Sequence, residues 1–434
     1  GDANLKHVLE VAGLKRVLSA GRFLDRLANL NLDLLGETLI TLEDLRREFT
    51  LPAKLSAMML ARRSPTAIAE HFGSARVAVS DTAVLLFTSG SEAAPKGVPL
   101  SHTNIIANLR GALAVPDLLR PTDTLLGFLP PFHSFGFTVA TMLPLVSGLK
   151  VVYYPNPTDS RHLVRLIASW RPTLLAGTPT FVAGIFKAAT PGQLSSLRLV
   201  ICGAEKMPAD LPAMAKTQGE MQFLEGYGIT ETAPVLTITP PGQPRVGVGQ
   251  PLGDAHLLIV DPETHLPLPQ GERGLVLACG SNVFSGYFGR ESASVFHEHA
   301  GQKWYITGDL GRLDAAGNLT LDGRLKRFVK VGGEMISLPA MEEAIVKRLP
   351  ADTEGKLLGA LAAQEIEGQR PVLAWFATTA IEVTTINQYL QEAGFSGLSR
   401  VQDTITVPEI PLLGTGKTDY RTLQKLLSEH LKQA

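Results

Sequence analysis

The chain has 434 residues, of which 45% are hydrophobic, an ordinary share for a soluble globular protein. Its 40 Lys and Arg residues and 41 Asp and Glu residues leave a formal net charge of −1. This balance gives no reason to expect a nucleic acid or a polybasic membrane contact. The length favours roughly three structural units and a large core.

One long uncharged stretch, Thr124–Leu149, has the length of a membrane span. It contains three prolines, His133 and several glycines, which break a spanning helix, so we expect a buried strand, a loop and a helix instead. The two cysteines have no zinc or redox spacing and lie in apolar runs, which favours buried thiols and a reducing, cytoplasmic setting. The first residues do not have the charged and then apolar pattern of a signal peptide. Because the sequence begins with Gly1 and not with Met, we expect it to be a piece of a longer polypeptide.

Residues 1–80 are expected to form the end of an α/β layer. Apolar residues have helical spacing from Leu5 to Leu18, and Arg16–Ser19 and Thr38–Thr41 have the composition of short strands.

From residue 82, apolar runs alternate with helical patterns. The runs predict strands at Ala83–Phe87, Leu125–Leu129, Lys150–Tyr154, Thr173–Ala176 and Leu197–Cys202. The helical patterns cover Asn104–Ala114, Arg161–Trp170, Pro179–Ala189 and Asp210–Lys216. Such alternation predicts a mostly parallel sheet covered by helices, which binds ligands at the carboxyl ends of its strands.

The pattern changes near residue 245 to short strands between turns. His256–Val260, Leu275–Ala278 and Trp304–Ile306 predict a β-rich subdomain that ends near residue 325. The remainder predicts a small α+β domain, with strands at Phe328–Val331 and Val372–Thr378, an apolar run at 357–363, and helices at 339–349, Thr385–Ala393 and Tyr420–Leu431. The class is therefore α/β, with an N-terminal domain at 1–325 and a C-terminal domain at 326–434.

The most informative stretch is Thr88-Ser-Gly-Ser-Glu-Ala-Ala-Pro-Lys-Gly97, which follows an apolar strand and precedes a helical pattern. Small residues let backbone N–H groups and hydroxyls approach phosphate oxygens, and Lys96 adds a positive charge. It is no Walker loop, because Lys96 lies between Pro95 and Gly97. Taken alone, an ordinary surface loop rich in Gly and Ser stays open.

Together with later motifs, this stretch resembles the phosphate loop of the adenylate-forming enzymes, which include acyl-CoA synthetases, luciferases and peptide-synthetase adenylation domains. The later motifs are similar to the family's in type and order: Leu199–Glu205, Tyr227–Glu231, Trp304–Leu310, Asp322–Arg327 and Pro411–Lys417. The resemblance covers almost the whole chain and implies the adenylate-forming enzyme fold, incomplete at its N-terminal end. It also implies that 326–434 is a mobile domain.

The resemblance implies ATP and Mg²⁺ as cofactors and assigns the nucleotide contacts. The phosphate loop set is Thr88, Ser89, Gly90, Ser91 and Lys96, of which Ser89, Ser91 and Lys96 would hold the β- and γ-phosphates. The adenine would lie beside Gly203, Ala204 and Glu205 and stack on Tyr227, which Gly228 follows. Thr230 would reach the α-phosphate, Glu231 the magnesium ion, Asp309 the ribose hydroxyls, and Arg324 the ribose or a phosphate.

The acid is expected near Pro130–Gly136. In the family, this segment shapes the acid pocket, so Phe132, His133 and Phe135 become pocket residues and His133 would lie near the reacting carboxylate. Adenylation domains for amino acids usually place an Asp here to pair with the ammonium group, whereas this chain has Phe132-His133. An unpaired ammonium in an apolar pocket is costly, which favours a fatty or other apolar acid.

The C-terminal motifs imply the catalytic lysine and the hinge. Lys417, in a Gly-rich segment, would bridge the carboxylate and the α-phosphate as negative charge moves in the transition state. Lys326 would be the pivot between the domains, and Val329–Glu334 resembles the loop along the entry path of the thiol arm.

These roles imply a two-step ligation: a carboxylate attacks the α-phosphate of ATP, and a phosphopantetheine thiol then displaces AMP from the acyl-adenylate. Within the family, the chain resembles an acyl-acyl carrier protein synthetase branch whose members also carry a glycerophospholipid acyltransferase domain. This resemblance lies in residues 82–105, 127–136, 203–205, 224–234, Lys326–Leu338 and Pro411–Asp419. That branch implies a fatty acid and acyl carrier protein as partners, phospholipid acylation as the context, and a cytoplasmic protein that would act at the inner face of the cell membrane. A medium- or long-chain acyl-CoA ligase, and a non-catalytic nucleotide-binding module, remain open.

Overall fold

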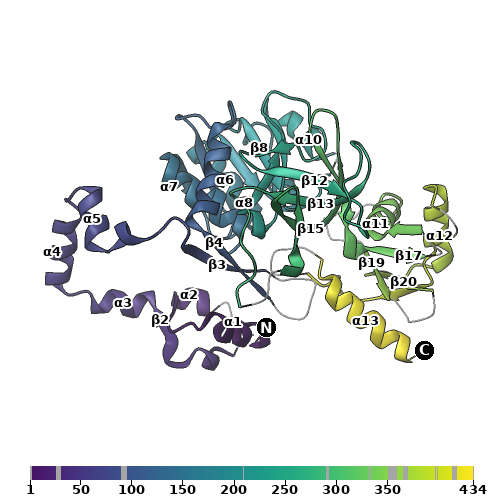
Figure 1. Cartoon of the computed structure of the whole chain (residues 1–434), viewed down its shortest axis with the longest axis horizontal. Helices are drawn as coiled ribbons and strands as arrows, with labels where there is room; N and C mark the ends of the chain where they lie inside the picture. The colour runs from purple at the N-terminus through teal and green to yellow at the C-terminus, as the bar shows by residue number, and fades with distance from the viewer. Residues whose placement is uncertain are drawn as a thin grey trace.

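We analysed a computed structural model that describes residues 2–25, 31–88, 95–208, 210–289, 293–331, 334–349, 359–364, 370–395, 397, 399–412 and 418–433. Along the chain it shows an N-terminal arm, a central body with two large sheets, and a C-terminal unit of mixed strands and helices (Figure 1).

The N-terminal arm holds the two short strands predicted from the sequence. β1 (Val17–Ser19) and β2 (Leu39–Thr41) pair in parallel. The arm's helices are α1 (Asp2–Ala12), α2 (Gly21–Leu24), α3 (Leu42–Glu48), α4 (Leu51–Leu60) and α5 (Pro65–His71), and α3 to α5 extend away from the body (Figure 1). Thr41, Thr50 and Ser64 begin α3, α4 and α5 by accepting a hydrogen bond from a backbone N–H three residues later. Large apolar side chains lie exposed along the arm, among them Leu51, Met59 and Phe72.

The phosphate-loop stretch connects the two strands of an antiparallel hairpin. β3 (Thr82–Thr88) pairs with β4 (Lys96–Ser101), and α6 (His102–Ala114) starts only after β4. The predicted strand Ala83–Phe87 and the predicted helix Asn104–Ala114 are confirmed, whereas the strand β4 between them was not predicted. The composition of β4 does not indicate a strand, because Gly97 and Pro99 are poor strand formers. The strand is stabilised by the complete burial of Val98 and Leu100.

The predicted parallel sheet is confirmed. Its seven strands run in the order β11-β10-β9-β8-β7-β5-β6. Five of them are parallel: β5 (Thr124–Gly127), β6 (Lys150–Tyr153), β7 (Leu174–Gly177), β8 (Leu199–Gly203) and β9 (Gln222–Gly228). β10 (Val235–Ile238) and β11 (Gln250–Pro251) complete the sheet in antiparallel pairs. It packs with α8 (Ser160–Trp170), α9 (Pro179–Ala188) and α10 (Leu211–Met214) around one apolar core.

The long uncharged stretch forms β5, a loop, a π-helical segment at Gly136–Met142 and α7 (Leu143–Ser147). Among the described residues, no helix has both the length and the apolar character needed to cross a membrane. Cys202 and Cys279 are both buried and free, as the sequence predicts, and burial raises the pKa of the Cys202 thiol to about 12.

The β-rich region is an antiparallel sheet of five strands. The order is β12 (His256–Val260), β13 (Gly274–Cys279), β15 (Gln302–Leu313) and β14 (Phe296–His299), with β16 (Leu319–Arg324) also paired to β15. β15 has 12 residues, far more than the predicted Trp304–Ile306. Gly308, at φ +75°, interrupts the strand pattern and coincides with a shift in the register between β13 and β15.

The C-terminal unit is built on two small sheets. β17 (Phe328–Val331) pairs with β18 (Glu334–Ser337), and β20 (Val372–Ala377) lies between β19 (Gly359–Gln364) and β21 (Asp403–Thr406). The neighbours Trp375 and Phe376 point to opposite faces of β20, and both are fully buried. Trp375 packs with α11 (Leu338–Val346) and α12 (Val383–Glu392), whereas Phe376 packs with α13 (Tyr420–Gln433).

Candidate active site

Several predicted site residues lie at or just beyond the carboxyl ends of neighbouring strands. Gly203 ends β8 and Gly228 ends β9, and Gly203 pairs with Gly226 across these two strands. The short 3₁₀ turn Thr230–Thr232 follows β9 directly and carries Thr230 and Glu231. Neighbouring parallel strands place their ends side by side, so the predicted adenine and magnesium segments share one edge of the sheet.

Asp309 links this edge to the second sheet. Its carboxylate accepts hydrogen bonds from the Tyr227 hydroxyl (2.5 Å) and from Arg324 Nε (3.0 Å). Asp309 and Arg324 face each other across β15 and β16. Burial, followed by the charge of Asp309, raises the pKa of Tyr227 well above its ordinary value, so this hydroxyl remains a proton donor. An ionised carboxylate has about four acceptor positions, so Asp309 retains capacity for the two hydroxyls of a ribose.

Lys96 and Glu231 meet at a residue that the sequence analysis did not identify. The Tyr287 hydroxyl donates a hydrogen bond to Glu231 Oε1 (2.7 Å), and Lys96 Nζ lies 5.0 Å from the centre of the Tyr287 ring. Glu231 is only 9% exposed. Tyr305 lies beside this group, with its hydroxyl 3.1 Å from that of Tyr287. Tyr305 stands within a predicted motif, but Tyr287 belongs to none, so only tertiary structure identifies it.

The predicted acid-pocket segment also approaches this edge. Ser134 Oγ lies 3.1 Å from Thr230 Oγ1. Phe135 is buried, and its ring is 3.7 Å from the position that a β-carbon would take on Gly203. His133 is half-buried, and its Nδ1 accepts a hydrogen bond from the backbone N–H of Phe135 (3.3 Å). Phe132 is 65% exposed, so of the two phenylalanines only Phe135 packs inward.

The loop after β8 is fixed on two sides. Ala204 has φ +69°, a conformation that few residues other than Gly adopt, and Glu205 Oε2 accepts a hydrogen bond from the Thr180 hydroxyl (2.6 Å). The next residue, Lys206, forms an ion pair with Glu343 of α11 (2.5 Å), so this loop contacts the C-terminal unit.

Four predicted site residues lie outside the part of the chain that the structure describes: Ser89, Gly90, Ser91 and Lys417. For Lys326 the structure describes the backbone, which lies in the 3₁₀ turn Leu325–Arg327. Thr88, the last residue of β3, pairs with Lys96. The segment that contains Lys417 is flanked by a β-bridge between Leu412 and Thr418.

The chemistry of this edge suits a polyphosphate with a hard cation. Within the described part of the chain, no group of three or more His, Cys, Asp or Glu side chains could hold a metal ion. Mg²⁺ usually takes one or two protein carboxylates and completes its coordination with phosphates and water, a role that Glu231 beside Lys96 fits.

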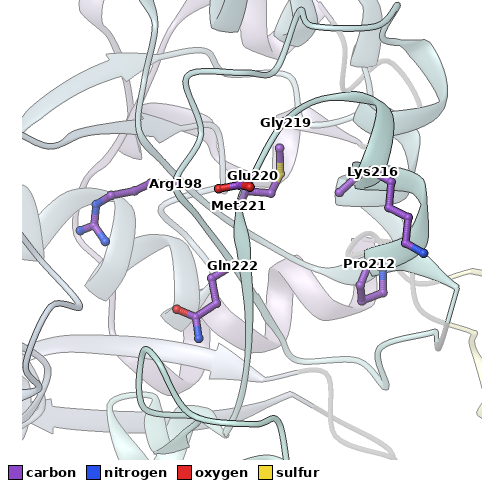
Figure 2. A pocket seen from close by; sticks show the side chains of 8 residues that line it. Arg198, Pro212, Lys216, Gly219, Glu220, Met221 and Gln222 are labelled. Carbon is purple, nitrogen blue, oxygen red and sulfur yellow. The ribbon is translucent and has the colours of Figure 1, made fainter.

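A separate surface hollow of about 440 Å³ lies elsewhere, lined by Arg198, Lys216, Glu220 and Gln222 among others (Figure 2). Arg198 precedes β8 and Gln222 begins β9, so the hollow lies at the amino ends of these strands. Ligands of parallel α/β sheets bind at the opposite edge, where Gly203 and Gly228 lie.

Comparison with known proteins identifies the family of the chain. The profile of the AMP-binding enzyme family, "AMP-binding enzyme", matches residues 1–288. A feruloyl-CoA synthase from Amycolatopsis sp is 31% identical over 293 residues, which is 65% of this chain and 55% of that protein. A long-chain-fatty-acid–CoA ligase from Bacillus subtilis is 29% identical over 276 residues, which is 61% of this chain and 48% of that protein. The chain thus spans about half the length of these relatives.

Among solved structures, ATP-bound MatB from Rhodopseudomonas palustris matches with a TM-score of 0.80. The match covers 98% of this chain and 82% of that one at 24% sequence identity, a level that supports the fold alone. The fold expected from the sequence, that of the adenylate-forming enzymes, is therefore confirmed.

Proposed function

Because the chain belongs to the AMP-binding enzyme family, we propose that the protein of which it is part activates a fatty acid with ATP and transfers the acyl group to a thiol. The observation that carries this proposal is the meeting of Lys96 and Glu231 at Tyr287. Lys96 comes from a hairpin and Glu231 from a turn after the parallel sheet, and the pair supplies one positive and one negative group for a metal-bound phosphate chain.

In the first step, the carboxylate of the acid attacks the α-phosphate of ATP, the bond between the α- and β-phosphates breaks, and pyrophosphate leaves with the electron pair. Lys96 would hold the β- and γ-phosphates together with Ser89 and Ser91, and Thr230 would contact the α-phosphate. Mg²⁺ at Glu231 would neutralise phosphate charge. Asp309, oriented by Tyr227 and Arg324, would accept hydrogen bonds from the ribose hydroxyls. Catalysis of phosphoryl-type transfer depends mainly on such positioning and charge neutralisation.

In the second step, a thiol sulfur attacks the acyl carbonyl and AMP leaves with the former carboxylate oxygen. We assign Lys417 to charge stabilisation in the first step. We further propose that residues 326–434 form a mobile domain that turns about Lys326 between the two steps. The ion pair between Lys206 and Glu343 is a contact that such a movement would break.

The fatty acid substrate is supported by the apolar segment around Phe135 and by Phe132-His133 at the place where an amino-acid pocket would carry a carboxylate. As acceptor we propose the phosphopantetheine thiol of acyl carrier protein, because six segments of the sequence resemble the acyl-acyl carrier protein synthetase branch. The context would be phospholipid acylation at the cytoplasmic membrane face. CoA is the alternative acceptor, favoured by the names of the relatives, a feruloyl-CoA synthase and a long-chain-fatty-acid–CoA ligase.

The test is fatty-acid-dependent exchange of labelled pyrophosphate into ATP by the full-length polypeptide. We expect exchange that requires both the acid and Mg²⁺. Acyl transfer is then compared with CoA and with holo acyl carrier protein at equal thiol concentration, and the faster acceptor decides between the two ligase types. ATP binding without any exchange would exclude the enzyme and favour a non-catalytic nucleotide-binding module.

A further inference from the structure

A short segment of the chain, Val283–Phe288, connects the hairpin to the turn that carries Glu231. The backbone N–H of Phe284 donates to the carbonyl oxygen of Glu231 (2.9 Å), and the backbone N–H of Phe288 donates to the carbonyl oxygen of Gly97 (2.9 Å). A β-carbon on Gly97 would lie 3.2 Å from Cβ of Phe288, so the hairpin and this segment are in close contact. The connecting segment therefore adds two backbone hydrogen bonds to the direct packing between the hairpin and the turn that carries Glu231.

Tyr287 lies within the connecting segment and contacts both charged groups. Its hydroxyl donates to Glu231 Oε1 (2.7 Å), and the face of its ring lies under Lys96 Nζ, 5.0 Å from the ring centre. An ammonium group is attracted to an aromatic face, and a carboxylate is stabilised by a neutral hydroxyl donor. One side chain therefore contacts the negative group through its hydroxyl and the positive group through its ring.

Tyr305 supports the orientation of Tyr287. Because the Tyr287 proton is donated to Glu231, the Tyr305 hydroxyl is the donor in the 3.1 Å contact between the two hydroxyls. Burial, and then the negative charge of Glu231, raises the pKa of Tyr305, so its hydroxyl keeps this proton. The ring of Phe284 packs edge-on against both tyrosines, with ring centres 5.0 and 5.1 Å away.

We propose that Tyr287 is a positioning residue that holds the Glu231 carboxylate and the Lys96 ammonium group in the arrangement needed for a magnesium-bound triphosphate. This inference rests on the proposed function. Its hydroxyl orients the carboxylate and its ring orients the ammonium group, so the two halves of the side chain have separable effects.

The test compares Tyr287→Phe, which keeps the ring, with Tyr287→Leu, which removes ring and hydroxyl. For Tyr287→Phe, we expect the Mg²⁺ concentration at half-maximal ATP binding, measured by calorimetry, to rise about tenfold, since a hydrogen bond to a charged group is lost. The half-maximal Mg²⁺ concentration for pyrophosphate exchange should rise in parallel. Tyr287→Leu should in addition weaken ATP binding at saturating Mg²⁺, because Lys96 loses its ring contact.

Two further variants serve as a control and as a second test. Tyr153, the last residue of β6, donates its hydroxyl proton to the carbonyl oxygen of Ala140 in the π-helical segment (3.0 Å). Tyr153→Phe removes this hydroxyl and should leave the Mg²⁺ dependence unchanged. Tyr305→Phe leaves Tyr287 intact and should raise the half-maximal Mg²⁺ concentration about threefold; it serves as the test if Tyr287→Phe does not fold. The proposal would be overturned if folded Tyr287→Phe showed the same Mg²⁺ dependence as the wild type. If Tyr287→Phe does not fold, the same result for Tyr305→Phe would overturn it. Either result would leave the proposed function intact. A wild-type protein that neither binds magnesium-ATP nor exchanges pyrophosphate would instead overturn the proposed function.

Discussion

Glu342 of α11 is the point where three parts of the C-terminal unit are joined. Its Oε1 accepts a hydrogen bond from the backbone N–H of Leu361 in β19 (2.6 Å). Its Oε2 pairs with Arg327 Nη2 (2.7 Å) and accepts a hydrogen bond from the Tyr420 hydroxyl (3.0 Å). The guanidinium group of Arg327 also lies on the Tyr420 ring, 3.5 Å from its centre. We predict that Glu342→Ala strongly destabilises this unit.

The size of the effect follows from burial. The side chains of Arg327 and Glu342 are each only 14% exposed, so removing the carboxylate leaves a largely buried guanidinium group without its counter-charge. Breaking such a pair costs about 3 kcal/mol of unfolding free energy. The adjacent Glu343 is the matched control. It pairs with Lys206 and Lys347, but its side chain is 42% exposed and theirs are 78% and 68% exposed, so Glu343→Ala should cost less than about 1 kcal/mol.

The assay is urea unfolding followed by the fluorescence of Trp375, which is fully buried in β20. The variants are made in a protein that also carries Trp170→Phe and Trp304→Phe, so that Trp375 is its single tryptophan. With an m-value of about 2 kcal/mol/M, Glu342→Ala should lower the midpoint by about 1.5 M. Replacing both charges, as Arg327→Met with Glu342→Leu, should recover part of the loss because no unpaired charge remains. Equal midpoints for Glu342→Ala and Glu343→Ala would refute this reasoning.

Three further predictions use other parts of the structure. Gly228→Ala should abolish soluble folded protein, because the added β-carbon would lie 2.0 Å from the Pro234 carbonyl oxygen. Gly203→Ala should fold, because the atom nearest to its β-carbon, the Gly226 carbonyl oxygen, is 3.3 Å away. Similar yields and melting temperatures for the two variants would contradict this prediction. Burial acts to raise the pKa of Asp123, but hydrogen bonds from Arg198, Thr173 and the Arg120 backbone, with the Arg198 charge, hold it below its ordinary value. Asp123→Asn should therefore lower stability by about 2 kcal/mol at pH 7, with a difference from wild type that shrinks as the pH falls below about 4; a constant difference from pH 7 to pH 3 would count against it. Lys206→Glu should change the ratio of the rates of adenylation and thioester formation severalfold, because it breaks the ion pair between Lys206 and Glu343. Adding Glu343→Lys in the same protein should restore the wild-type ratio. An unchanged ratio in Lys206→Glu would show that this ion pair favours neither step.

The sequence predicted those elements whose apolar pattern and burial agree. β5, β7 and β8 are short apolar runs buried on both faces of a sheet, and α8 and α9 keep helical periodicity, so pattern and structure coincide within a few residues. β4 and β9 were missed for the opposite reason. β4 contains Gly97 and Pro99, and β9 contains Glu225 and two glycines, so these strands depend on neighbours in the folded chain rather than on local preference.

The residues of the candidate site also differ in how far the sequence alone indicates them. Residues expected to touch a ligand directly, such as Lys96, Glu231 and Asp309, are charged and stand in short motifs, so they can be proposed from the sequence. Residues that orient those groups do so through contacts between segments far apart in the chain: Tyr287 is 56 positions from Glu231, and its spacing from Lys96 is larger still. No local pattern marks such a residue, since a tyrosine in a turn has the same composition whether its hydroxyl meets water or a buried carboxylate. Because the precision of a site depends on this supporting layer, a sequence can predict which chemistry is present and still omit the side chains that hold it in place.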